Sequence, residues 1–248
     1  MKNIVKIFFC SVSFLFITFT TNSQQQVSFK ASDGLLVTAD LYKSGEKNPY
    51  LILCHQAHYS RGEYRETARK LMKLGYNCLA VDLRSGGEVN YVQNETALLA
   101  QSSNVSHDFI DASKDINAAI DFIYKIDKKR IILVGSSYSA SLCLMIAKKD
   151  IRIKAVIAFS PGEFFYPRFS VRDSLSGLNK PAFICCSSFE YPYIEKLVEN
   201  IPHGNLSLFK PQPGQTTLGS KILWNDNPYH NEYWLALLMF INKIKDTC

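Results

Sequence analysis

The chain has 248 residues, of which 47% are hydrophobic and 20% are charged, and its formal net charge is +6. This composition is typical of a single globular domain that is long enough to bury a large core. The positive charges are spread along the chain without a basic block, so we predict no nucleic-acid partner.

Residues 1–23 have the pattern of a signal peptide. A short basic segment precedes an apolar run at 7–19, and Thr21-Asn22-Ser23 offers small residues for cleavage. The run is short for a membrane span, and an uncleaved anchor is the alternative interpretation. We therefore expect residues 24–248 to form an exported domain, periplasmic or extracellular, with no stable membrane insertion after cleavage.

The rest of the chain alternates short apolar runs with helical patterns. Residues 27–30 and 35–42 flank a glycine turn and are typical of a hairpin. Continuous apolar runs indicate strands covered on both faces at 50–54, 77–83, 131–134, 154–159, 182–186 and 206–209. Helical spacing is found at 61–74, 107–126, 141–147, 193–200 and 231–244. The long polar segment 84–106 is interpreted as a functional or lid-like loop.

Repeated strand–helix units predict an α/β fold with one mostly parallel eight-stranded sheet and helices on both faces, in a single domain. Ligands of such sheets bind beyond the carboxyl ends of the strands. Cysteines after the signal segment fall mostly within predicted strands or a helix, so we expect small buried side chains. No metal-ligand spacing is found, and we predict no metal or cofactor.

The segment Gly135-Ser136-Ser137-Tyr138-Ser139 lies between a predicted strand and a predicted helix. A serine at the apex of a sharp strand–helix turn is typical of a nucleophile elbow, G-x-S-x-G, in which the flanking residues must be small. Ser139 stands where that motif has glycine. An ordinary serine-rich turn is the alternative interpretation, so other parts of the chain must decide.

Polar stretches that end the predicted strands give further information: Leu53-Cys54-His55-Gln56-Ala57, Asp82-Leu83-Arg84-Ser85-Gly86-Gly87 and Phe159-Ser160-Pro161-Gly162-Glu163. With these stretches, and with the elbow after the fifth strand, residues 27–244 resemble the α/β-hydrolase fold. They look most like dienelactone-hydrolase-like esterases and peptidases. The resemblance implies a serine nucleophile, Ser137, and a small-molecule acyl substrate.

The resemblance also implies the positions of the other site residues. The oxyanion hole is expected to use the backbone N–H groups of Gln56 and Tyr138. Glu190 occupies the place of the triad acid, with Asp82 and Asp173 as weaker alternatives. His55 is expected to hold its loop in place and not to act as a base.

The expected general base is missing from its usual loop, where Leu218 stands at the histidine position. His230 is our candidate for a relocated base and His58 is the alternative, whereas His107 and His203 are interpreted as solvated or structural. Two functions therefore remain open. The chain is either a secreted serine esterase using Ser137, Glu190 and His230, or a degenerate binding protein that keeps the fold. The sequence does not indicate an oligomeric state.

Overall fold

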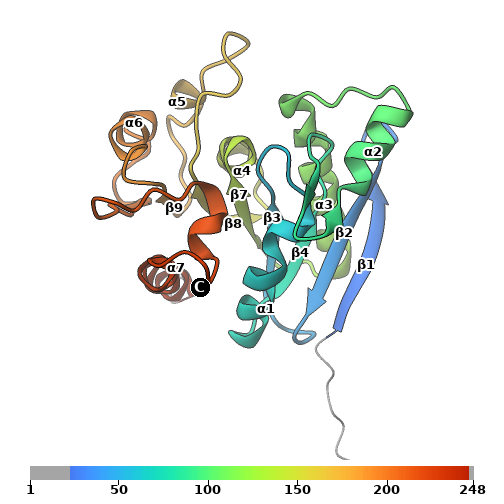
Figure 1. The fold of residues 1–248 in the computed structure, drawn as a ribbon, viewed down its shortest axis with the longest axis horizontal. Helices are drawn as coiled ribbons and strands as arrows, with labels where there is room; N and C mark the ends of the chain where they lie inside the picture. The colour runs from blue at the N-terminus through green and yellow to red at the C-terminus, as the bar shows by residue number, and fades with distance from the viewer. Residues whose placement is uncertain (1–22, 246–248) are drawn as a thin grey trace, which may run out of the picture.

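The structure, a computed structural model, describes residues 23–245 (Figure 1). The predicted signal sequence lies outside the described residues except for Ser23, which begins the first strand. The main sheet contains β1 (Ser23–Lys30), β2 (Leu36–Lys43), β3 (Tyr50–Cys54), β4 (Asn77–Val81), β7 (Ile131–Ser136), β8 (Ile153–Phe159), β9 (Ala182–Cys185) and β10 (Leu206–Leu208). All were predicted, β1 and β2 as a hairpin and the others from their apolar runs, although β1 begins earlier because the polar residues Gln24 and Gln26 also pair with β2.

The strand order is β1-β2-β4-β3-β7-β8-β9-β10. The β1–β2 and β2–β4 pairs are antiparallel and all other pairs in this sheet are parallel. The predicted α/β fold with a mostly parallel eight-stranded sheet is therefore confirmed. Cys54 pairs with Val81 and with Gly135, which brings the carboxyl ends of β3, β4 and β7 to one edge.

Helices cover both faces of the sheet (Figure 1). The side chains of α1 (Arg65–Lys73) and α7 (His230–Lys245) join one buried cluster with the sheet. The other cluster includes residues of α3 (Ala112–Ile126), α4 (Tyr138–Lys149), α5 (Val171–Ser174) and α6 (Tyr191–Leu197). No helix within residues 23–245 is both long and apolar enough to cross a membrane.

Two of the predicted helices begin with 3-10 turns. The turns are η1 (Arg61–Tyr64) before α1 and η2 (Phe109–Asp111) before α3.

Cysteines within the described part are buried and free, as expected of small apolar side chains: Cys54, Cys78, Cys143, Cys185 and Cys186.

The interpretation of residues 84–106 as a long loop is wrong. This segment contains a small hairpin, β5 (Glu88–Val89) with β6 (Val92–Gln93), and the helix α2 (Glu95–Ser102). Asn90 and Tyr91 both have a positive φ, 53° and 59°, as a tight two-residue hairpin turn requires. Asn94 caps α2 by accepting a hydrogen bond from Ala97 N–H, and its amide donates to Tyr59 O and Leu83 O. Local polar groups thus order a segment that has no apolar period.

A buried ion pair joins this segment to the core. The side chains of Arg84 and Asp115 are both fully buried, with Nη2 2.7 Å from Oδ1. Arg84 also donates to Asp33 Oδ2 at 2.6 Å, and its backbone N–H donates to Asp115 Oδ2 at 2.9 Å. These contacts compensate the guanidinium for its lost hydration.

We expect Asp115→Ala to lower the free energy of unfolding by about 3–5 kcal/mol, because a buried guanidinium would lose its main partner. Urea unfolding measures this loss. Asp121→Ala removes a carboxylate that is 58% exposed and pairs with Arg152, so it should cost less than about 1 kcal/mol. Equal losses in the two variants would contradict the assignment of Asp115 as a core anchor.

Candidate active site

The predicted nucleophile elbow corresponds to the turn between β7 and α4. Ser137 has φ 59° and ψ −125°, a strained conformation for a residue with a side chain. Gly135 must be glycine, because a Cβ there would lie 2.5 Å from Ala140 Cα. Ser137 is half-buried and makes no side-chain cap to the helix. The hydroxyl therefore stands at the carboxyl edge of the sheet, outside the apolar core.

The serine in the fifth motif position has a structural explanation. Ser139 Oγ accepts a hydrogen bond from Ser136 N–H at 2.9 Å and donates to Cys54 O at 2.8 Å. The hydroxyl thus connects the elbow to the end of β3, a contact that glycine cannot make. A serine at position 139 is therefore compatible with the strained backbone conformation of Ser137.

Backbone N–H groups near Ser137 differ in their availability. Tyr138 is the first residue of α4, and its N–H donates no hydrogen bond within residues 23–245. Gln56 N–H donates to Glu63 Oε2 at 2.8 Å, so our prediction that it serves the oxyanion hole needs correction. The neighbouring Ala57 N–H is without an acceptor in the same part of the chain. The N–H groups of Ala57 and Tyr138 are therefore among those that donate no hydrogen bond at this edge within residues 23–245.

Burial and hydrogen bonds hold the loop after β3 and the turn after β7 in place. His55 is fully buried, with Nδ1 2.7 Å from Gln56 O and Nε2 accepting from Leu83 N–H at 2.8 Å. Burial lowers the pKa of His55 to about 4, so the ring is neutral and structural at neutral pH. Tyr138 is also buried, and its ring stacks on Phe109 with centroids 4.4 Å apart.

The carboxylate of Glu190, the predicted acid, accepts hydrogen bonds from two neighbouring serines. Its Oε2 accepts hydrogen bonds from Ser187 N–H at 2.9 Å, Ser187 Oγ at 2.9 Å and Ser160 Oγ at 2.8 Å. No imidazole is hydrogen-bonded to this carboxylate in the described part of the chain. Ser160, with φ 51°, accepts a further hydrogen bond from Gly219 N–H at 2.9 Å.

Leu218 precedes the 3-10 turn η3 (Gly219–Leu223) and is 49% exposed. The turn is attached to the strand ends on both sides, because Gly219 N–H donates to Ser160 Oγ and Ser220 N–H donates to Ser136 Oγ, each at 2.9 Å. A Cβ on Gly219 would lie 2.5 Å from Gln56 Oε1 and from Ser136 Oγ. The two residues that follow Leu218 are thus bonded to the neighbour of Ser137 and to a partner of Glu190.

Glu63 lies beside the candidate site and was not predicted. Its side chain is fully buried, and its Oε1 accepts from Ser220 Oγ at 2.5 Å while Oε2 accepts from Gln56 N–H. Burial raises the pKa of Glu63 from 4.5 to about 7. The carboxyl group therefore joins the loop after β3 to η3. A glutamate in an amphipathic pattern is usually solvated, so the sequence carried no signal for this role.

Residues 37–184, more than half of the chain, match the sequence model of the dienelactone hydrolase family. The chain belongs to this family. The matched region contains the elbow and both loops that surround it, whereas Glu190 and Leu218 lie beyond it.

Relatives of this dienelactone hydrolase family member include two fungal proteins. A thiohydrolase of Arthrinium phaeospermum is 30% identical over 57% of this chain and 44% of its own length. A polyketide transferase of Stachybotrys chlorohalonatus is 28% identical over 65% of this chain and 56% of its own length. The matches thus span about half the length of these relatives. An esterase of Pyrococcus furiosus has the same fold, with a TM-score of 0.67 at 16% identity over 90% of this chain and 91% of its own.

The histidines of this family member do not complete a relay within residues 23–245. His230 is the first residue of α7 and is half-buried, and its Nδ1 lies 2.7 Å from Asn227 O. No hydrogen bond joins it to Ser137 or Glu190 in the described part of the chain. His58, with φ 64°, is exposed on the loop after β3, and both His107 and His203 are also exposed.

Of the two alternative candidates for the triad acid, one is hydrogen-bonded to an arginine and the other is exposed. Asp82 Oδ1 accepts from Arg61 N–H at 2.7 Å and Oδ2 lies 2.5 Å from Arg61 Nη1, which accounts for its buried charge. Asp173 is exposed on α5. Residues 23–245 contain no cluster of three or more His, Cys, Asp or Glu that could hold a metal ion.

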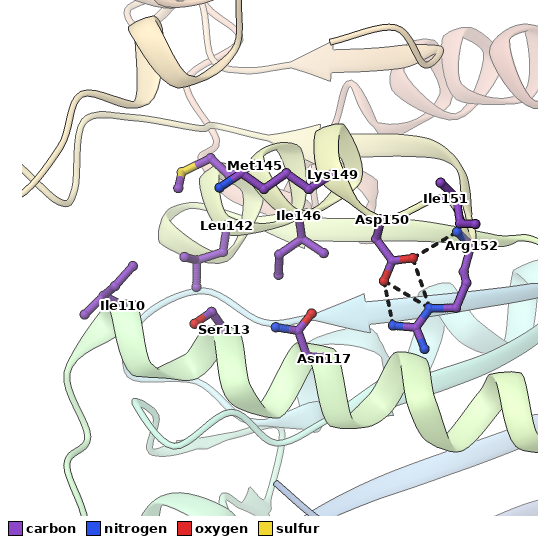
Figure 2. A pocket seen from close by; sticks show the side chains of 10 residues that line it. All are labelled: Ile110, Ser113, Asn117, Leu142, Met145, Ile146, Lys149, Asp150, Ile151 and Arg152. Atoms are coloured by element: carbon purple, nitrogen blue, oxygen red, sulfur yellow. Dashed lines mark hydrogen bonds and ion pairs between the residues drawn. The ribbon is translucent and has the colours of Figure 1, made fainter. Parts of the chain in front are cut away.

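A hollow of about 590 Å³ lies between α3 and α4, away from this site (Figure 2). Its apolar wall includes Leu142, Met145 and Ile146 of α4, and Asn117 of α3 faces them. The Asp150–Arg152 pair closes the end that leads to the start of β8. Because β8 starts at the amino edge of the sheet, this hollow extends away from Ser137.

Proposed function

We propose that this protein is a serine hydrolase that cleaves thioesters and other activated carboxylic esters, with Ser137 as the nucleophile. The observation that carries the proposal is the strained elbow conformation of Ser137 beside the free N–H groups of Ala57 and Tyr138. In this arrangement Ser137 Oγ attacks the acyl carbon and the N–H groups stabilise the resulting oxyanion. The preference for activated substrates follows from the missing base.

Without an imidazole hydrogen-bonded to Ser137, the leaving group has to depart without receiving a proton. A thiol of pKa about 8.5 leaves readily as a thiolate, whereas an alkoxide does not. In the first step the serine oxygen forms a bond to the acyl carbon, the carbon–sulfur bond breaks, and the serine proton passes to solvent. Water then adds to the acyl-serine carbon, the bond from that carbon to the Ser137 oxygen breaks, and the serine oxygen takes a proton from solvent as the carboxylic acid is released. Because no side chain supplies this proton, we expect the second step to be slower than the first. The name of the thiohydrolase relative agrees with this substrate class.

Glu190 and His230 have other roles in this proposal than a triad would give them. Glu190 fixes Ser160 and, through it, Gly219 N–H, so it positions η3. His230 is not assigned to proton transfer, because its Nδ1 is bonded to Asn227 O. Export of the chain is proposed on the signal-like segment 1–23, and the expected observation is a mature N-terminus at residue 24.

A second function is favoured by Leu218. Leucine cannot accept a proton, and the loss of a triad base commonly removes most of the rate enhancement. A protein of this kind would keep the pocket for binding and turn over little or no substrate. The two functions differ in whether the Ser137 hydroxyl reacts.

Labelling with a fluorophosphonate probe distinguishes the two functions. We expect the mature protein to be labelled and Ser137→Ala to lose all labelling, because a phosphonate captures an activated serine held beside an oxyanion hole. Ser102→Ala, which changes an exposed serine at the end of α2, should label like the parent protein. Absence of labelling in the parent protein would support the binding function and sink the hydrolase proposal.

A further inference from the structure

A second concave surface lies on the outer side of α1. It is a hollow of about 700 Å³ between α1, the tip of the β5–β6 hairpin and the segment that follows η3. Four cationic side chains of α1 line it: Arg65, Arg69, Lys70 and Lys73. The carboxylates that line the same hollow belong to Glu66 and Asp226. Cations therefore outnumber carboxylates here.

Two of these cations are uncommitted. Lys70 Nζ contacts Glu66 Oε1 at 3.1 Å and Asn225 Oδ1 at 2.7 Å, so its charge is compensated. Arg69 and Lys73 are exposed and have no ion pair within residues 23–245. With Arg65 they repeat at a spacing of four residues, which places like charges side by side along one helix face and destabilises the helix.

An unsatisfied hydroxyl group lies beside the same cations. Arg69 and Lys73 also line an adjoining hollow of about 310 Å³, together with Tyr42 of β2. Tyr42 is 1% exposed, and its buried hydroxyl has no hydrogen-bond partner. Burial raises the pKa of Tyr42, the negative charge of Asp40 adds to that rise, and the charges of Arg69 and Arg65 oppose it. A buried O–H without an acceptor requires an explanation, and an anion held by Arg69 and Lys73 provides one.

Two aromatic side chains complete the larger hollow. Tyr91 is 97% exposed at the hairpin tip, where Asn90 Nδ2 donates to Gly62 O and Arg65 Nη1 donates to Asn90 O. Trp224 is anchored by its indole N–H, which donates to Glu63 O at 3.0 Å. Both rings are thus presented on fixed backbone at the edge of a cationic surface.

We propose that Arg69, Lys73 and the Tyr42 hydroxyl form a binding site for an organic phosphate or sulfate ester. The cations and the O–H hold the oxyanion, and Trp224 with Tyr91 contacts the aromatic or apolar part of the same ligand. Charge-assisted hydrogen bonds from planar guanidinium and ammonium groups are the usual means of holding such anions. This site does not depend on Ser137, and its test is independent of the proposed hydrolase function.

Calorimetric titration of the mature protein with 1-naphthyl phosphate tests this site. We expect binding in the micromolar to millimolar range, with inorganic phosphate and 1-naphthol each binding at least about tenfold more weakly because each lacks one half of the ligand. The double variant Arg69→Gln/Lys73→Gln should lose about tenfold or more in affinity. Lys125→Gln/Arg130→Gln, which removes an exposed lysine and arginine elsewhere, should bind like the parent protein.

Tyr42→Phe separates a ligand role from a packing role. It removes a hydroxyl that has no partner, so the variant should fold at least as stably as the parent protein. If the hydroxyl donates to the anion, affinity should fall about three- to tenfold without loss of stability. Affinity equal to that of the parent protein in Tyr42→Phe or in the double variant, or absence of binding at 10 mM (a limit on the order of the weakest specific sites), would overturn the proposal.

Discussion

Leu218→His should raise kcat/KM for a simple alkyl ester by about 100-fold, the lower end of what general acid–base catalysis contributes. The position is the one where the family resemblance places the base, and the next two N–H groups are bonded to Ser160 Oγ, a partner of Glu190, and to Ser136 Oγ, next to the proposed nucleophile. An imidazole there can take the serine proton and return it to the departing alkoxide. The kcat/KM for thioesters should increase much less, so the ratio of kcat/KM for thioesters to kcat/KM for alkyl esters should fall.

Two controls define the origin of such a gain. Leu218→Gln adds polarity without a base and should leave the alkyl esterase rate within about twofold of the parent protein, whereas Leu218→His should acquire a kinetic pKa near 6.5. Leu218→His combined with Ser137→Ala should be inactive. A gain in Leu218→Gln equal to that in Leu218→His would show that access to the pocket, and not proton transfer, limits the rate.

The sheet could be predicted because each parallel strand is covered on both faces and must be apolar throughout. The runs at Tyr50–Cys54 and Ala182–Cys185 are fully buried, and their ends agree with the sequence pattern to within a residue. Residues 84–106 were misinterpreted because hydrogen bonds of Asn94 and the ion pair of Arg84 organise that segment. Contacts of this kind leave no periodic signal in a sequence.

The candidate site was predictable to a similar extent. The small residues around Ser137 reflect the space available at this turn, so the motif together with the polar stretches that end the other strands indicated its position. The direction of a backbone N–H is not encoded in residue type, and Gln56 was therefore chosen where Ala57 has the free group. Glu190 follows the expected strand, but its hydrogen bonds to Ser160 and Ser187 depend on tertiary contacts.

Glu63→Gln should change how stability depends on pH. The folded protein raises the pKa of Glu63 from 4.5 to about 7, so the folded state binds this proton more tightly than the unfolded chain does. The resulting stabilisation is fully present below pH 4.5 and is lost as the pH rises through about 7. The loss amounts to roughly 3 kcal/mol, at 1.36 kcal/mol for each pH unit of the shift. Glutamine does not titrate, so Glu63→Gln removes this decline of the free energy of unfolding with rising pH.

Urea unfolding at pH 5, 6.5 and 8 measures the effect. The free energy of unfolding of Glu63→Gln minus that of the parent protein should increase by roughly 2.5 kcal/mol from pH 5 to pH 8, because a small part of the loss occurs below pH 5. Glu195→Gln, which changes an exposed glutamate on α6, should follow the parent protein at each pH. Parallel curves for Glu63→Gln and the parent protein would show that Glu63 is not held protonated by its surroundings.

The same substitution connects stability to the candidate site. Above pH 7 the ionised Glu63 costs stability, yet as a charged acceptor it binds Gln56 N–H and Ser220 Oγ more strongly than a neutral amide can. Gln56 precedes Ala57, whose N–H we assign to the oxyanion hole. Glu63→Gln should therefore be more stable than the parent protein at pH 8 and yet have a lower kcat for thioesters with little change in KM. That combination is expected only if the buried carboxylate is retained for positioning the loops and not for folding.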